Sequence, residues 1–261
     1  MRAFLVCLVI LFTGSVAWAQ SATPEQKAQL APTGALRAAI VTIPFLAKKD
    51  AAGTVTGVAP DLGAEMARVL AVPYQPTVYE TPPAGMKAMR EGAADVIFLA
   101  PTLERIGQVD FAPAFMEMEL SLLVMAGSPI QTLADVDQPG RRIVVYERSA
   151  NEEMVRQKLS KATRVLVPLS DYKKAFEMIR NGEADAFADL LYQTAANQAD
   201  MPGTRIVPGA IGHNALAIGI TKDKSAAAAY AKAFTETAIK SGLVTKSIEK
   251  AGVRGAAPPR M

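Results

Sequence analysis

The sequence predicts an α/β fold with two similar lobes that are joined by two hinge crossings. Short apolar strands alternate with segments in which apolar residues recur at helical spacing, a pattern typical of helices packed on a sheet. One helix-to-strand unit, residues 89–96, is echoed by residues 179–186. Two further apolar strands, Ser121 to Met125 and Ala215 to Ile220, flank the second alternating block. We therefore expect these two strands to carry the chain between the lobes.

The composition is that of a globular protein. Half of the 261 residues are hydrophobic and a fifth are charged, which is enough apolar material for a sizeable core. The formal net charge is +3. This excess gives no basic patch dense enough to neutralise a phosphate backbone, so no nucleic-acid partner is expected.

The N-terminal segment, residues 1–19, has the pattern of a signal peptide. Arg2 precedes an apolar run from Ala3 to Phe12, and Ala17-Trp18-Ala19 is a small-x-small triplet suited to a signal peptidase. We expect export with cleavage after Ala19, and an uncleaved signal anchor is the alternative. Cleavage would remove Cys7, the only cysteine, so the exported chain could hold neither a disulfide nor a thiolate metal site.

The first half of the chain contains five elements, in the order strand, helix, strand, helix, strand. The first strand precedes the breaker Pro44, and Asp61 is the capping candidate for the helix that follows. The residues that mark these elements are Leu36 to Val41 (strand), Leu62, Met66, Val69 and Leu70 (helix), Val78 (strand), Met86 and Met89 (helix), and Val96 to Leu99 (strand).

The second half repeats the alternation and ends in a long helix. The marking residues are Arg142 to Tyr146 (strand), Asn151 to Leu159 (helix), Arg164 to Val167 (strand), Tyr172, Ala175, Phe176 and Ile179 (helix), Ala186 to Ala188 (strand), Ala215 to Ile220 (strand), and Tyr230, Phe234 and Ala238 (a helix that ends near Gly242).

The echoed units each combine a helix end, a glycine stop, a tight turn and entry into a buried strand. The matching positions are Gly92 and Asp95 in the first unit and Gly182 and Asp185 in the second. Two similar lobes explain the echo, and chance similarity of such turns is the alternative. Asp95 and Asp185 are expected to be structural.

The expected lobes follow from these elements. Lobe 1 is expected to comprise residues 34–124 and 216–255, and lobe 2 residues 125–215. Residues 256–261, which include Pro258-Pro259, are expected to form a disordered tail.

A set of segments carries a family resemblance through its order and spacing. The segments are Leu36 to Ile40, Pro44-Phe45, Gly57 to Leu62, Gly92 to Val96, and Thr102-Leu103-Glu104-Arg105 continuing to Val109-Asp110-Phe111. Together they resemble the bacterial family 3 extracellular solute-binding proteins. The resemblance implies a type II periplasmic-binding-protein fold that closes on a solute between its lobes. It also implies a periplasmic receptor that delivers an amino acid or related small carboxylate to the membrane permease of an ABC importer.

The resemblance implies ligand contacts in the Thr-x-x-Arg segment. In that family the Arg binds the ligand carboxylate, and here its position is Arg105. A planar guanidinium binds a carboxylate through two parallel charge-assisted bonds, which supports the transfer. The alternative is a surface arginine paired with Glu104 or Asp110. Thr102 either offers its hydroxyl to the same ligand or caps the following turn.

From lobe 2 the resemblance implies ligand contacts at a helix start, where free N–H groups attract a carboxylate. Ser149 and Asn151 occupy this place, although Arg148 stands where the family usually has Gly, and an ordinary N-cap is the alternative for Ser149. Asp189 lies nearest to the family's ammonium-binding aspartate, but it follows Asp185 by four residues where many relatives show five. A solvated aspartate at a strand end is the alternative.

Two departures leave the substrate open. Ala100 stands where amino-acid receptors often carry a Ser or Thr that touches the ligand, and Thr42 stands near a position where several carry an aromatic residue. Phe45 either lines the cleft or belongs to the core. A small carboxylate and a differently sized amino acid are therefore as credible as a polar amino acid.

Catalysis is the main functional alternative. Some members of the fold are periplasmic dehydratases that act on prephenate or arogenate. His213, the only histidine, lies by the second crossing, where a hinge or surface role is favoured over catalysis. No cluster has metal-ligand spacing and no Gly-rich phosphate loop is present. We expect a monomeric binding protein with no catalytic residue, metal or cofactor, and a ligand-sensing accessory protein is a further alternative.

Overall fold

The computed structural model describes residues 22–168 and 171–259. The expected signal peptide, with Cys7 and the cleavage point after Ala19, lies outside the described residues. The helices are α1 Pro24–Leu30, α2 Val58–Leu70, α3 Pro82–Arg90, α4 Leu103–Ile106, α5 Leu133–Val136, α6 Ala150–Lys158, α7 Tyr172–Arg180, α8 Leu191–Asp200, α9 Ser225–Lys240 and α10 Leu243–Ala251.

The strands alternate with these helices. They are β1 Leu36–Val41, β2 Lys48–Lys49, β3 Val55–Thr56, β4 Tyr74–Tyr79, β5 Val96–Leu99, β6 Val109–Met125, β7 Arg142–Tyr146, β8 Thr163–Val167, β9 Ala186–Leu190, β10 Thr204–Ile206, β11 Gly212–Thr221 and β12 Ala256–Ala257. The expected bounds of β1, β5 and β7 are confirmed.

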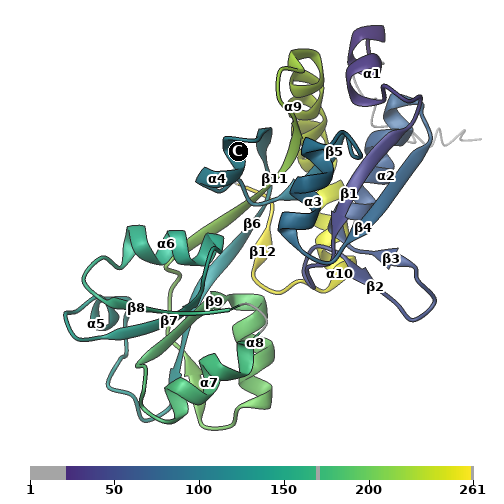
Figure 1. Ribbon diagram of the computed structural model, residues 1–261. Coiled ribbons are helices and arrows are strands. Elements are labelled where there is room, and N and C mark those ends of the chain that lie inside the picture. Colours follow the sequence, from purple (N-terminus) through teal and green to yellow (C-terminus); the bar gives the residue numbers. More distant parts are fainter. Residues whose placement is uncertain (1–21, 169–170, 260–261) are drawn as a thin grey trace, which may run out of the picture.

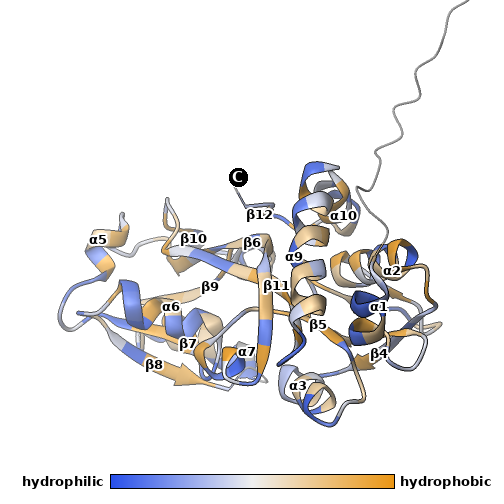
Figure 2. Cartoon of the chain, turned by 90° about the horizontal axis from the view of Figure 1, so that it is seen from above, coloured by the Kyte–Doolittle hydropathy of each residue, from blue (hydrophilic) through white to orange (hydrophobic). Residues whose placement is uncertain are grey.

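The strand order places two parallel units on either side of a long antiparallel pair. The order is β4-β1-β5-β11-β6-β9-β7-β8, while β10 and β12 also pair with β6. β1 is parallel to β4 and β5, and β7 is parallel to β8 and β9. In Figure 1, α1, α2, α3, α9 and α10 gather around the first unit, α6, α7 and α8 gather around the second, and β6 and β11 run between them. Figure 2 shows the same two groups from above. The chain therefore has the expected two-lobed α/β fold.

The crossings lie closer to the middle of β6 and β11 than the sequence suggests. Ser121 already pairs with Asp189 of β9, so the expected crossing from Ser121 to Met125 belongs to the sheet of lobe 2. On β11, residues 217–220 pair with β5 of lobe 1, and the register shifts between Leu216 and Ala217. The crossings are therefore the segments before Leu120 on β6 and before Ala217 on β11, which pair with each other and, at Glu117 and Met118, with β12. Polar residues interrupt the apolar pattern of β6, so the sequence alone does not show that this strand extends from Val109 to Met125.

The echoed turns have the same interactions in both lobes. Arg37 at the start of β1 donates from Nε and Nη2 to the Asp95 carboxylate at 2.9 and 2.6 Å, and from Nη1 to the Gly92 carbonyl at 2.7 Å. In lobe 2, Arg142 at the start of β7 donates from Nε to Asp185 at 3.3 Å and from Nη2 to the Gly182 carbonyl at 2.8 Å. The expected structural role of both aspartates is confirmed.

The glycines in these turns have a conformational reason. Their φ angles are 69° and 70°, in the left-handed region that a residue with a Cβ adopts at a cost. The same backbone geometry in both lobes explains why a sequence echo is visible across otherwise different segments.

The N-cap of helix α2 lies four residues before the expected cap, Asp61. Its N-cap is Gly57, whose φ is 138° and whose added Cβ would lie 2.5 Å from the Leu46 carbonyl oxygen. Asp61 instead lies in the first turn, where its Oδ1 accepts a hydrogen bond from Lys250 Nζ at 3.0 Å. The close approach of two backbones excludes a capping side chain and requires glycine.

The chain end differs from the expected disordered tail. Ala256–Ala257 form β12, which pairs with β6 opposite Met118 and Glu117. Next to this strand, the Glu119 backbone N–H donates to the Gly255 carbonyl at 3.0 Å. Backbone pairing of this kind depends on an available neighbouring strand edge, so the local proline-rich composition does not reveal it. Residues 260–261 lie outside the described residues.

Helix α1 is held against lobe 1 by contacts with α9. Gln29 Oε1 accepts a hydrogen bond from the Ala227 backbone N–H at 3.0 Å, which satisfies a donor in the first turn of α9. Lys224 Nζ donates to the Gln29 carbonyl at 2.9 Å. Over the described part of the chain, no helix has the length and apolarity needed to cross a membrane.

Candidate functional site

A groove of about 190 Å³ lies between the two lobes. Its walls come from the end of β5 and the start of α4 in lobe 1, from one face of α6 in lobe 2, and from the start of β11. Figure 1 shows α4 and α6 facing one another beside the two connecting strands. The residues that line it are Ala100, Pro101, Thr102, Ala150, Glu153, Met154, Gln157, His213, Asn214 and Ala215.

Arg105 adjoins the lobe 1 side of this groove, although it is not one of the residues that line it. It belongs to α4, and its Nη1 donates to the carbonyl of Ala100, a groove residue, at 3.0 Å. Burial lowers the pKa of the Arg105 guanidinium, and the neighbouring Glu104 opposes this shift. Among the described residues Arg105 makes no ion pair with either Glu104 or Asp110. The half-buried cation thus has hydrogen-bond donors to spare at the edge of the groove.

Thr102 lines the groove directly. It is the N-cap residue of α4, but its side chain makes no capping hydrogen bond. The Arg105 backbone N–H instead bonds to the Thr102 carbonyl at 2.9 Å. The hydroxyl is therefore available to a molecule in the groove, and capping does not explain this residue.

Ser149 is the N-cap of α6. Its hydroxyl donates to the Tyr146 carbonyl at 2.6 Å and accepts from the Glu152 backbone N–H at 3.0 Å. Arg148, in the place where the family usually has Gly, has a φ of 55°, which is the left-handed conformation that glycine adopts easily. The hydroxyl of Ser149 thus serves the turn with its donor and the cap with one acceptor site.

Asn151 and Asp189 meet below the groove. Asn151 Nδ2 donates to Asp189 Oδ1 at 2.9 Å, and Asn214 of β11 donates to Asn151 Oδ1. The Leu190 backbone N–H also donates to Asp189 Oδ1, at 2.8 Å. Asp189 Oδ2 is buried without a hydrogen-bond partner in the described structure. Only Asn214 of these three lines the groove, so the structure brings Asn151 and Asp189 to each other and not to the groove surface.

Burial dominates the electrostatics of Asp189. Desolvation raises the pKa of this carboxyl to about 7, against the opposing effects of the hydrogen bonds from Leu190 and Asn151. Ser121 of β6 adds a further contact, since its hydroxyl donates to the Asp189 carbonyl at 3.2 Å. Asp189 therefore joins β9 to α6 and to both connecting strands through a buried polar cluster.

Phe45 contacts the other lobe. The Phe45 ring, in the loop between β1 and β2, meets the Tyr192 ring of α8 edge to face at a centroid distance of 6.5 Å. Lys48 Nζ lies 5.9 Å from the centroid of the same Tyr192 ring. This contact spans from lobe 1 to lobe 2 but involves none of the groove residues.

Several residues of α6 and α8 that line the groove or contact Phe45 were not predicted from the sequence. Glu153, Met154 and Gln157 line the groove, and Tyr192 meets Phe45. The spacing of 153, 154 and 157 places them on one helix face, which is a signal that could have been used once the helix was expected. Tyr192 lies in a helix that the apolar periodicity does not reveal. His213, expected at a hinge or surface, lies on β11, is exposed and lines the groove.

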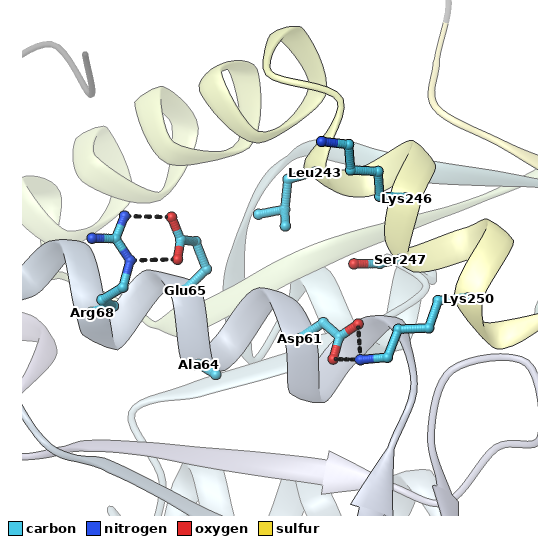
Figure 3. Close-up of a pocket in the computed structure, with 8 residues that line it drawn as sticks. All are labelled: Asp61, Ala64, Glu65, Arg68, Leu243, Lys246, Ser247 and Lys250. Atoms are coloured by element: carbon cyan, nitrogen blue, oxygen red, sulfur yellow. Dashed lines mark hydrogen bonds and ion pairs between the residues drawn. The ribbon is translucent and has the colours of Figure 1, made fainter. Parts of the chain in front are cut away.

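A larger concavity of about 370 Å³ lies elsewhere, between α2 and α10 on lobe 1. Figure 3 shows two ion pairs among its charged side chains, Lys250 with Asp61 at 3.0 Å and Arg68 with Glu65 at 2.6 Å, and draws Lys246 without one. These pairs stabilise the surface between two helices of one lobe. No group of three or more His, Cys, Asp or Glu side chains in the described part of the chain could hold a metal ion.

Comparisons with known proteins identify the family. Residues 38–252 match the sequence profile of the bacterial extracellular solute-binding proteins, family 3. The ABC transporter glutamine-binding protein GlnH of Bacillus subtilis is 28% identical over 100 residues, which are 38% of this chain and 36% of that protein. The chain thus aligns with about a third of the length of that curated relative.

Solved structures extend the likeness to the whole fold. The ancestral amino-acid-binding protein AncCDT-1, a precursor of cyclohexadienyl dehydratase, has a TM-score of 0.64 at 24% identity, covering 85% of this chain and 96% of that one. An ancestral arginine-binding protein bound to glutamine has a TM-score of 0.62 at 25% identity, covering 85% and 98%. With the two-lobed sheet and the matched segment, these findings show that the chain belongs to the bacterial extracellular solute-binding proteins of family 3.

Proposed function

We propose that the protein is a periplasmic receptor that binds an amino acid or related carboxylate between its lobes and delivers it to the permease of an ABC importer. Arg105 binds the carboxylate and Thr102 adds a hydroxyl. Phe45 lies outside the groove and joins lobe 1 to lobe 2 through its contact with Tyr192. Ser149 and Asn151 act by shaping the start of α6, and Asp189 holds Asn151 in place. The receptor works as a monomer after export from the cytoplasm.

One observation carries this proposal. The groove is lined by both lobes and by the strand that joins them, so a molecule held there contacts both moving parts. Arg105 lies at its edge as a half-buried cation whose carboxylate partner is missing from the described residues. A desolvated guanidinium gains most from a carboxylate that reaches it in two parallel hydrogen bonds. Closure of the lobes would bury that pair.

A thermal-shift screen tests the proposal. The mature protein, purified from the periplasm, is melted with each of the twenty L-amino acids and with succinate, L-malate and 2-oxoglutarate. We expect at least one of these to raise the melting temperature increasingly with concentration, as mass action requires. Absence of any stabilisation across the panel contradicts the proposal. N-terminal sequencing of the same sample should give Gln20 as the first residue.

A dehydratase is the second candidate, because the groove contains groups that could transfer protons. Glu153 and His213 both line it, and a general acid must lie within reach of the leaving group. Conversion of prephenate or arogenate by the purified protein, followed by absorbance, would favour this function. We expect no turnover.

A further inference from the structure

A ligand with a positive charge would need a carboxylate partner in the groove. Asp189, the carboxylate expected from the sequence, does not lie at the groove surface. Asp189 is 4% exposed, and its Oδ1 is engaged by Asn151 and by the Leu190 backbone. Asn214 closes over Asn151 from the connecting strand β11. A ligand in the groove would have to displace this chain of hydrogen bonds to touch the Asp189 carboxylate.

Glu153 is the carboxylate that the groove does present. It lies on the face of α6 that lines the groove together with Ala150, Met154 and Gln157, opposite Thr102 of lobe 1. Its side chain is half-buried, and its Oε1 accepts a hydrogen bond from Gln157 Nε2 at 3.3 Å. It takes part in no ion pair of the described structure.

Glu152, the neighbour of Glu153 on α6, differs from it because the Glu152 carboxylate has structural partners within lobe 2. Glu152 is used by the turn: its Oε2 accepts from the Arg148 backbone N–H at 2.7 Å, and its Oε1 accepts from Arg164 at 3.3 Å. Glu153 has no such structural partner. Lobe 2 therefore gives the groove one anion, Glu153, and Arg105 of lobe 1 adjoins the groove through its hydrogen bond to the Ala100 carbonyl.

We propose that Glu153 is a specificity-determining residue that binds the positively charged group of the ligand across from Arg105. The inference rests on the proposed receptor function and deepens it: the ligand is a zwitterionic or cationic amino acid, and a simple dicarboxylate is disfavoured. A carboxylate that accepts a charge-assisted hydrogen bond from an ammonium or guanidinium group stabilises such a ligand. The same carboxylate repels an acid that offers only negative charge.

The test compares Glu153→Gln with wild type. Glutamine keeps the size of the side chain and removes its charge. Glu177→Gln, at an exposed site on α7 outside the groove, is the matched control. Each protein is titrated calorimetrically with L-arginine, L-glutamine, succinate and the tightest-binding member of the twenty L-amino acids. Melting of the unliganded variants checks that they are folded.

We expect Glu153→Gln to weaken amino-acid binding by about 10- to 100-fold and to leave or strengthen succinate binding, with Glu177→Gln unchanged. The opposite response of the two ligand classes separates a lost charge from general damage to the groove. Wild-type affinity for amino acids in Glu153→Gln overturns this role and leaves the receptor function standing. A wild-type protein that binds only succinate also overturns it. Failure of the wild type to bind any member of the panel overturns the receptor function itself.

Discussion

Arg105 is the side chain on which affinity for a carboxylate should depend most strongly. Arg105→Ala removes the charge-assisted pair and leaves the ligand anion without its partner, which is expected to cost about 2–5 kcal/mol, or about 30-fold to several-thousand-fold in affinity. Arg105→Lys should also bind weakly, because a point charge cannot form the bidentate pair. Isothermal titration of both variants measures the effect.

The unliganded protein provides the control for Arg105. The guanidinium bonds only to the Ala100 carbonyl within the described structure, so melting of the free Arg105→Ala variant should change little. Lost stability with unchanged affinity would instead identify a structural arginine.

The raised pKa of the buried Asp189 carboxyl predicts that the free energy of unfolding depends on pH near neutrality. Its pKa is raised to about 7, so the folded state holds a proton that the unfolded chain has released between about pH 4 and pH 7. This group therefore makes the free energy of unfolding fall as the pH rises through that window, by at most about 1.4 kcal/mol per pH unit. Asp189→Asn should remove the contribution.

Urea unfolding of wild type and Asp189→Asn at several pH values between 4.5 and 8 measures this contribution. Asparagine can keep the acceptor for Asn151, so the variant should gain stability relative to wild type as the pH rises. Parallel curves for the two proteins would show that Asp189 does not titrate in this range.

At the residue scale, the sequence predicts the interactions that follow from chain-local patterns. The structural roles of Asp95 and Asp185 are of this kind, and the structure confirms them. Ser149 was expected to contact the ligand, with capping as the alternative, and in the structure it caps α6. Asp189 and Asn151 illustrate the limit: whether a polar side chain faces a groove or another polar side chain depends on packing between distant segments. Periodicity alone cannot give that orientation.

The two helix-to-strand turns have similar interactions, but their aspartates differ in burial. The Asp95 side chain is 1% exposed and that of Asp185 is 23% exposed, although both pair with an arginine at the start of a strand. Asp95→Asn should lower the free energy of unfolding by about 1.5–3 kcal/mol, since it removes charge-assisted bonds from a buried site. Asp185→Asn should cost at most about 1 kcal/mol.

Thermal melting distinguishes these two variants. A loss of 1 kcal/mol lowers the melting temperature by about 2–4 °C in a domain of 150–250 residues. Equal shifts for Asp95→Asn and Asp185→Asn would contradict the assignment of the difference to burial.

Elements with strong apolar patterns are the ones that the sequence predicts well. Strands β1, β5 and β7 are buried for nearly their whole length and have the expected bounds. Helix α8 and strand β12 were not expected, because β12 is formed by backbone pairing with β6 and α8 contains only two large apolar residues, Leu191 and Tyr192. The extension of β6 to Val109 was missed because half-buried positions and one exposed position, Pro113, interrupt the apolar pattern of its first half.

On the scale of the whole molecule, ligand binding should bring the lobes together. The two connecting strands β6 and β11 pair with one another along both lobes, which allows the lobes to move about this strand pair. Small-angle scattering should show a smaller radius of gyration when the protein is saturated with the amino acid found by the screen. The same addition to Arg105→Ala at equal concentration should leave the radius unchanged, and a decrease there would contradict closure through Arg105.

The two crossings also determine the order in which the molecule can fold. Lobe 2 is built almost entirely from one continuous stretch, whereas lobe 1 needs both ends of the chain: Gln29 of α1 bonds to Ala227 of α9, 198 residues later. Contacts of such long sequence separation form late, because the intervening chain must first be organised. During synthesis the first strands of lobe 1 are made before lobe 2, whereas β11 and α9 are made after it. The apolar strands of lobe 1 therefore remain exposed until β11 and α9 have been synthesised. Aggregation competes with folding during this interval.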